Sequence, residues 1–133
     1  MSMEVTERRL QWIHQSDRAI LFIDLKDASA ADSLLVLEGL PGVLASSAEN
    51  SVLALADVSG SAYDPSVSAR WKSAHLAFKP KVRAVAVYGF SGIVGVSLRG
   101  FLDMFRLMGM VRFGQELRLF STRDDALAWL TKV

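Results

Sequence analysis

The residues most able to take part in chemistry follow an apolar run at Val52–Ala56, where Asp57 is succeeded by Val58 and the pair Ser59-Gly60. A carboxylate and a hydroxyl two residues apart can hydrogen-bond the backbone of a tight loop, and a glycine beside them supplies a positive φ. The apolar run itself predicts a buried central strand, because it is short and ends in turn residues. Open α/β sheets usually place function in the loop after such a strand, so Asp57, Ser59 and Gly60 form the first candidate site.

A second candidate lies after another apolar run, Val82–Tyr88, where the chain contains Gly89, Ser91 and Gly92. Backbone amides at the start of a helix can bind an anion or a carbonyl oxygen, and the alternative is an ordinary tight turn. The segment is not a phosphate-binding loop, because the Walker spacing and its Lys-Ser/Thr pair are missing. Nor is it a nucleophile elbow, which needs Gly-x-Ser-x-Gly.

A third candidate is the segment Phe101–Met110, which is apolar over more than one helical stripe. Its methionines and phenylalanines form an adaptable apolar surface, for which a small apolar or lipid-like ligand is one interpretation. The other interpretation is packing against the sheet on one side and against a second subunit, in a homodimer, on the other. The residues concerned are Phe101, Met104, Phe105 and Met108.

Composition excludes several kinds of chemistry. The chain of 133 residues contains no cysteine, so disulfides and thiol nucleophiles are excluded, and a reducing cytoplasm fits. The two histidines, His14 and His75, lie far apart without an acid at ligand spacing, and no nucleophile, base and orienting group come together. We therefore expect no catalytic residue, no metal and no cofactor, and hence no enzyme.

The charge of the chain is balanced overall but unevenly distributed. Residues 1–65 carry a net charge of −6 and residues 66–123 one of +8, against +1 for the whole chain. Either the two halves attract each other within one fold, or the asymmetry marks a partner surface. The nearly neutral net charge of the whole chain argues against a nucleic-acid partner. The apolar stretch Ala84–Leu98 is shorter than the roughly 18 residues of a membrane span, and no signal peptide opens the chain.

The order of the predicted elements is that of a single α/β domain over residues 1–133. Apolar and polar residues alternate at residues 10–15, and an apolar run follows at residues 19–23. With Ser16-Asp17 as the turn between them, these two segments predict a hairpin. Helix starts are expected at Ser29, at Asp64-Pro65, after Ser91-Gly92 and at Ser121 or Thr122, each following a strand. The result is a four- to five-stranded, mostly parallel sheet with about four helices packed around it. The first helix contains Gly39, Pro41 and Gly42, which should bend or break it near its middle.

This element order and the motif Asp57-Val58-Ser59-Gly60 resemble the STAS family, the SpoIIAA-like anti-sigma-factor antagonist domains. In that family a central strand ends in Asp-Ser-Ser-Gly or a close relative. The resemblance is closer to a STAS-like subgroup of small bacterial proteins, which share a D-V-[ST]-G loop, a later apolar strand ending in glycine and a C-terminal A-x-x-W-L. Here these are Asp57–Gly60, Val85–Gly89 and Ala126–Leu130, and the match spans roughly residues 8–133.

The resemblance implies a non-enzymatic regulatory module that binds a protein partner, with Ser59 as the position that a partner kinase phosphorylates in many members. In this chain Ser61–Tyr63 separate the motif from the predicted helix cap at Asp64, so Ser59 is expected in a loop. The alternative function is a carrier or sensor of a small apolar or lipid-like ligand, an analogy drawn from the architecture of related lipid-carrier domains.

Overall fold

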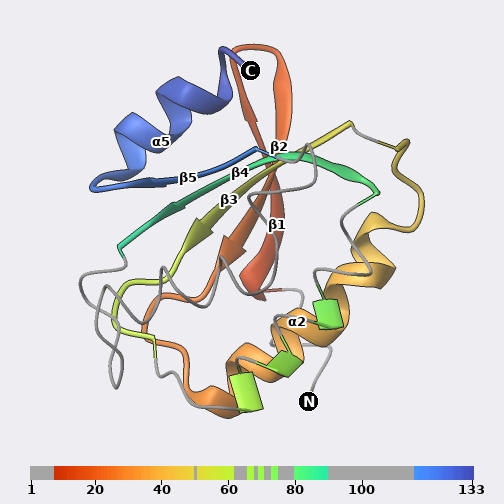
Figure 1. Ribbon diagram of the computed structural model, residues 1–133, viewed down its shortest axis with the longest axis vertical. Coiled ribbons are helices and arrows are strands. Elements are labelled where there is room, and N and C mark those ends of the chain that lie inside the picture. The colour runs from red at the N-terminus through yellow and green to blue at the C-terminus, as the bar shows by residue number, and fades with distance from the viewer. Residues whose placement is uncertain are drawn as a thin grey trace.

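The computed structural model describes residues 8–49, 51–61, 66–67, 69–70, 73–74, 80–89 and 116–133, which build one five-stranded sheet with helices on both faces (Figure 1). The strands lie side by side in chain order, and only the first pair is antiparallel. Their bounds are β1 (Leu10–Gln15), β2 (Arg18–Asp24), β3 (Val52–Asp57), β4 (Val82–Tyr88) and β5 (Glu116–Phe120). The predicted α/β class and the mostly parallel sheet with an added hairpin are confirmed.

The hairpin turns through two residues with left-handed backbone. Ser16 has φ 51° and Asp17 has φ 63°, and neither is glycine. Positive φ at both central residues is the property of the type I′ turn, whose twist matches that of the paired strands. The strand twist therefore imposes a conformation here that the side chains do not favour by themselves.

Two helices are described along their whole length, and both begin at a capping side chain. The hydroxyl of Ser29 accepts the N–H of Asp32 at the start of α2 (Ala30–Leu44), and that of Thr122 accepts the N–H of Asp125 at the start of α5 (Arg123–Leu130). Each capping oxygen satisfies one backbone donor that has no partner within its helix. Ser29 was predicted as a cap, and Thr122 was one of the two predicted caps of the last helix.

The predicted break of the first helix near its middle is wrong, because α2 continues through Pro41 to Leu44. Proline removes one helical hydrogen bond and crowds the preceding turn, which costs about 3 kcal/mol in an isolated helix. Residues on both sides of Pro41 are almost completely buried, among them Val36, Leu40 and Leu44. Burial of a large aliphatic side chain contributes roughly 1.5–3 kcal/mol, so the contact with the sheet outweighs the local preference.

Each face of the sheet has its own apolar core. The core under α2 joins Leu37 and Leu40 to Leu21, Ala54 and Val85 of the central strands. The core under α5 joins Ala126 and Leu130 to Ile20, Leu55 and Ala86. Because side chains alternate along a strand, each central strand contributes to both cores, and its near-continuous apolar sequence follows from that.

Between β3 and β4 the described residues 66, 67, 69, 70, 73 and 74 are helical, and this piece runs beside α2 (Figure 1). Val67 and Ala74 are buried, as the predicted apolar face requires, and Arg70 forms an ion pair of 3.3 Å with Glu38 of α2. Trp71 and Phe78 of that predicted face, and the helix predicted from Ser91-Gly92 to Met108, lie outside the described residues.

Candidate functional site at the carboxyl end of the sheet

Polar side chains end three neighbouring strands of the parallel part of the sheet. Asp24 of β2 pairs in register with Asp57 of β3, which pairs with Tyr88 of β4. Tyr88 in turn pairs with Phe120 of β5. Tyr88 belongs to the core under α5, and the register with the alternation of side chains places Asp24 and Asp57 on the same face. The carboxyl end of the sheet therefore carries a row of polar groups beside α5.

The loop after β3 is held by hydrogen bonds from three sides. The Oδ1 atom of Asp57 accepts the N–H of Ser59 at 2.9 Å, which closes an Asx turn. The carbonyl of Ser59 accepts the N–H of Asp27 at 2.8 Å, and the N–H of Val58 donates to the carbonyl of Tyr88 at 3.1 Å. Gly60 has φ 66°, the positive value expected for it. The backbone around Ser59 is thus fixed, and Ser59 lies in a turn, as predicted.

Two glycines allow neighbouring loops to approach this turn closely. A Cβ atom on Gly60 would collide with the carboxylate of Asp27 in the loop after β2. A Cβ atom on Gly89 would collide with the hydroxyl of Ser59 and lie 2.9 Å from its backbone nitrogen. Gly89 also has φ 83°, which disfavours any other residue. The structure therefore brings two candidate loops of the sequence together, with Ser59 directly against Gly89.

The loop after β2 is fixed by an arginine from the start of the sheet. The Nη1 atom of Arg9 donates to the carbonyls of Asp24 and Lys26 at 3.1 and 3.0 Å. The Nη2 atom lies 3.9 Å from the carboxylate of Asp32 in the first turn of α2. Arg9 thus holds in place the loop whose Asp27 donates to Ser59, and this loop forms one wall of the site.

Electrostatics at this end of the sheet centre on Tyr88. Its pKa is raised above the ordinary value of a tyrosine, first because its ring is buried and then because the negative charge of Asp57 disfavours the phenolate. Hydrogen bonding to Arg123 and the positive charge of that side chain act in the opposite direction. Arg123, in the first turn of α5, also lies over the ring of Phe22 at 4.7 Å. Tyr88 therefore stays a neutral hydroxyl between a carboxylate and a guanidinium.

Sequence reasoning missed Asp27, Tyr88 and Arg123 as members of the site. A signal existed for Tyr88, because the residues that end parallel strands meet at one edge of the sheet. Asp24 and Asp57 could have been paired by the same argument. No such signal existed for Asp27 or Arg123, since their places depend on how a loop and a helix pack.

The remaining predicted residues are not placed by the structure. Ser91 and Gly92 of the candidate anion-binding turn lie outside the described residues. The same holds for the candidate ligand or dimer surface at Phe101, Met104, Phe105 and Met108.

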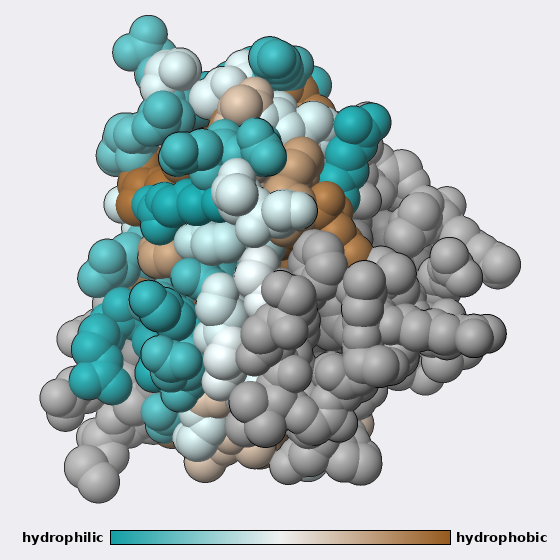
Figure 2. Space-filling view, turned by 90° about the vertical axis from the view of Figure 1, so that its left-hand side faces the viewer, coloured by the Kyte–Doolittle hydropathy of each residue, from teal (hydrophilic) through white to brown (hydrophobic). Residues whose placement is uncertain are grey.

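The described part of the chain offers neither a metal-binding cluster nor a membrane-spanning helix. No group of three or more histidine, aspartate or glutamate side chains there could hold a metal ion, and no helix there is long and apolar enough to cross a membrane. Figure 2 shows the side on which α5 lies, where the described surface is mostly hydrophilic or neutral with a few apolar side chains.

No family model and no curated protein matches the chain. A solved structure does: an uncharacterised protein of the DUF3478 family from Shewanella loihica PV-4, described as having a SpoIIAA-like fold. The two superpose with a TM-score of 0.63 over 91% of each chain, at 18% sequence identity. The likeness confirms the fold that the motif and element order predicted: this chain has a SpoIIAA-like fold.

Proposed function

We propose that this protein is a non-enzymatic, STAS-like regulatory module of the cytoplasm, which binds a protein partner through the surface around Ser59. In this proposal phosphorylation of Ser59 releases the partner. The observation that carries it is the contact of the Ser59 hydroxyl with Gly89, on a turn whose backbone is fixed by neighbouring strands and loops.

A phosphoryl group on Ser59 would be repelled by the charges already present. Phosphorylation adds about −1.5 to −2 charges at neutral pH. Asp57, whose carboxylate bonds the backbone of Ser59, is only 8% exposed, so solvent screens its charge poorly. Asp24 lies next to it in register on β2. The modification therefore favours any rearrangement that moves Ser59 away from these carboxylates.

Steric crowding at Ser59 favours the same rearrangement as the electrostatic repulsion. There is no room for a single Cβ atom between Gly89 and the hydroxyl of Ser59. A phosphoryl group must point away from β4 or displace the chain at Gly89, and either change alters the surface that the two loops form together. A partner that recognises the unmodified arrangement would lose affinity.

The contacts of the polar residues support binding rather than catalysis. Asp57 accepts the amide of Ser59, and Tyr88 is held neutral by burial beside it. The carboxylate of Asp57 and the backbone carbonyl of Tyr88, which accepts the N–H of Val58, thereby stabilise the turn. A module that presents a surface needs well-positioned loops more than a free base.

The test compares Ser59→Asp with Ser59→Ala for binding of protein partners isolated with the wild-type chain. Ser59→Asp should weaken binding about tenfold or more, because it adds a charge beside Asp57, whereas Ser59→Ala should bind as the wild type does. Ser46→Asp is the matched control, because Ser46 is exposed and follows α2 at the other end of the sheet. Equal affinity of Ser59→Asp and Ser46→Asp would contradict the proposal.

A further inference from the structure

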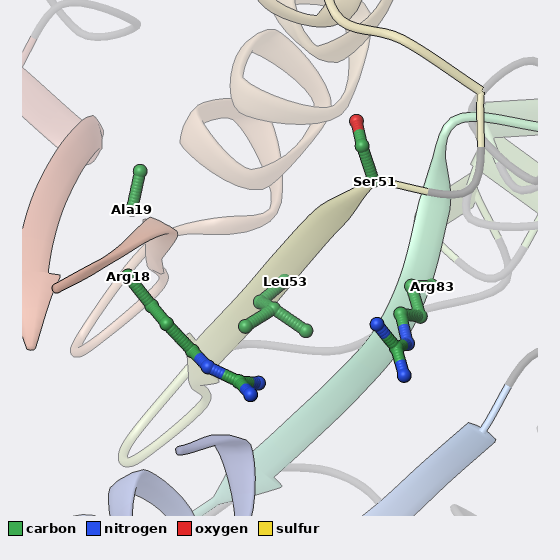
Figure 3. A pocket seen from close by; sticks show the side chains of 5 residues that line it. All are labelled: Arg18, Ala19, Ser51, Leu53 and Arg83. Atoms are coloured by element: carbon green, nitrogen blue, oxygen red, sulfur yellow. The ribbon is translucent and has the colours of Figure 1, made fainter. Parts of the chain in front are cut away.

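A shallow pocket lies at the opposite end of the sheet from Ser59, on the face that α5 covers. Its volume is about 270 Å³, and its lining consists of Arg18, Ala19, Ser51, Leu53 and Arg83. The side chains of Arg18 and Arg83 come from β2 and β4 and point toward each other across Leu53 of β3 (Figure 3). Two of the five lining residues carry a positive charge, and none of the five carries a carboxylate side chain.

Arg18 is held in place by the chain around it. Its Nη1 atom donates to the carbonyl of Leu130, the buried last residue of α5, at 3.2 Å, and to a main-chain oxygen of Val133. A guanidinium has five N–H donors in a fixed plane, so the Nε and Nη2 atoms keep three of them. The anchoring therefore orients the guanidinium, and its other edge has no hydrogen-bond partner among the described residues.

Arg83 is placed by an irregularity of the sheet. Val52 of β3 pairs with Val82, but the next residue, Leu53, pairs with Ala84, so Arg83 is an extra residue on β4. The amides of Ser51 and Val52 both donate to the carbonyl of Lys81 at this point. Bulges of this kind re-aim a side chain, and they are rare between parallel strands. Arg83 is exposed and forms no ion pair with the described residues.

We propose that Arg18 and Arg83 form a binding site for the phosphate group of a small phosphorylated molecule. One guanidinium satisfies both oxygens of a carboxylate, whereas a phosphate has three terminal oxygens and about two charges, enough for both arginines. Leu53 and Ala19 supply apolar contact for the organic part of the ligand. This site is independent of the function proposed for the Ser59 surface.

The experiment titrates the whole chain with inorganic phosphate, followed by calorimetry and phosphorus NMR at constant ionic strength, with acetate as the planar monoanion. Phosphate should bind saturably and more tightly than acetate. Arg83→Gln should weaken phosphate binding about tenfold, since a hydrogen bond to a charged group is worth roughly 1.5–3 kcal/mol. Arg83→Lys should fall in between, because lysine keeps the charge but not the planar fork.

Arg8→Gln is the matched control, since Arg8 is exposed and precedes the strand that starts beside the carboxyl end of β2. It removes the same charge at the other end of the sheet and should change affinity less than twofold by this account. Binding of inorganic phosphate should also weaken as pH falls through its second pKa, where the dianion becomes a monoanion while both guanidinium groups stay charged. Absence of saturable binding, equal affinity for acetate, or an equal effect of Arg83→Gln and Arg8→Gln would overturn the proposal.

Discussion

At the scale of single residues, the candidate site depends on how closely Ser59 and Gly89 approach each other. The loops after β3 and β4 meet without a side chain between them, because Gly89 has no Cβ atom and adopts φ 83°. Asp57 fixes the turn from within through its bond to the amide of Ser59. Small changes at these positions should therefore affect both the stability of the fold and the surface around Ser59.

Gly89→Ala should lower the free energy of unfolding by roughly 1–3 kcal/mol, because alanine is disfavoured at a positive φ and its Cβ collides with Ser59. Chemical denaturation measures the change. Gly42→Ala is the matched control, since nothing lies within 4 Å of a Cβ there and the residue is in α2. That control should be neutral or stabilising by up to about 1 kcal/mol. A Gly89→Ala variant as stable as the wild type would show that the loops do not approach as described.

Tyr88 should make the fold sensitive to alkaline pH. Burial raises the pKa of Tyr88 in the folded protein, so this residue keeps its proton at a pH where the unfolded chain loses it. Its contribution to stability is complete below about pH 10, the ordinary value for tyrosine, and is lost as pH rises through the folded value.

Melting temperatures measured at increasing pH should consequently fall less steeply above about pH 10 in Tyr88→Phe than in the wild type. Tyr63→Phe, which removes the only other tyrosine, serves as the comparison. If the melting temperatures of the wild type and of Tyr88→Phe fall equally as pH rises, burial beside Asp57 does not hold the proton on Tyr88.

At the scale of elements, the β1–β2 hairpin shows a tertiary preference overriding a local one. Its turn needs positive φ at two consecutive residues, and the chain supplies serine and aspartate rather than asparagine and glycine. The same conflict appears in α2, where a long buried face carries the helix through Pro41. In both elements the sheet decides the backbone conformation.

The hairpin predicts a stabilising replacement. Changing Ser16-Asp17 to Asn-Gly should raise the free energy of unfolding by roughly 1 kcal/mol, because both new residues tolerate the left-handed region. As a control, Ala45→Gly places glycine where φ is −56° and should destabilise by roughly 0.5–1 kcal/mol. The two variants should move the denaturation midpoint in opposite directions; movement in the same direction would rule out relief of turn strain.

At the scale of the whole molecule, the uneven charge of the sequence is partly neutralised within the fold. Arg70, from the positive half of the chain, pairs with Glu38 from the negative half. Arg123, also from the positive half, interacts with Tyr88 in the site where Asp57 from the negative half lies. These contacts support the interpretation that the two halves attract each other. The positive pair Arg18 and Arg83 has no such partner among the residues that line its pocket.

The sequence was sufficient to predict the strands, the mostly parallel sheet with its antiparallel hairpin, the cap at Ser29 and, as one of two candidates, the cap at Thr122. These follow from periodicity and from hydrogen-bonding side chains. Asp57-Val58-Ser59-Gly60 also located the turn. Its surroundings were not predictable, because the approach of Gly89 and Asp27 to Ser59 depends on the packing of separate loops. The position of Arg83 in the pocket could not be predicted either, because a bulge between parallel strands leaves no pattern in the apolar run of β4.

The most direct test of the central claim is the mass of the protein purified from its own host, measured under native conditions and again after denaturation. The proposal predicts two populations: unmodified chains in complex with a partner protein, and uncomplexed chains carrying a phosphoryl group that survives denaturation and is absent from Ser59→Ala. Phosphorylated chains that remain in the complex as often as unmodified ones would contradict it. So would chains that carry neither a partner nor a modification.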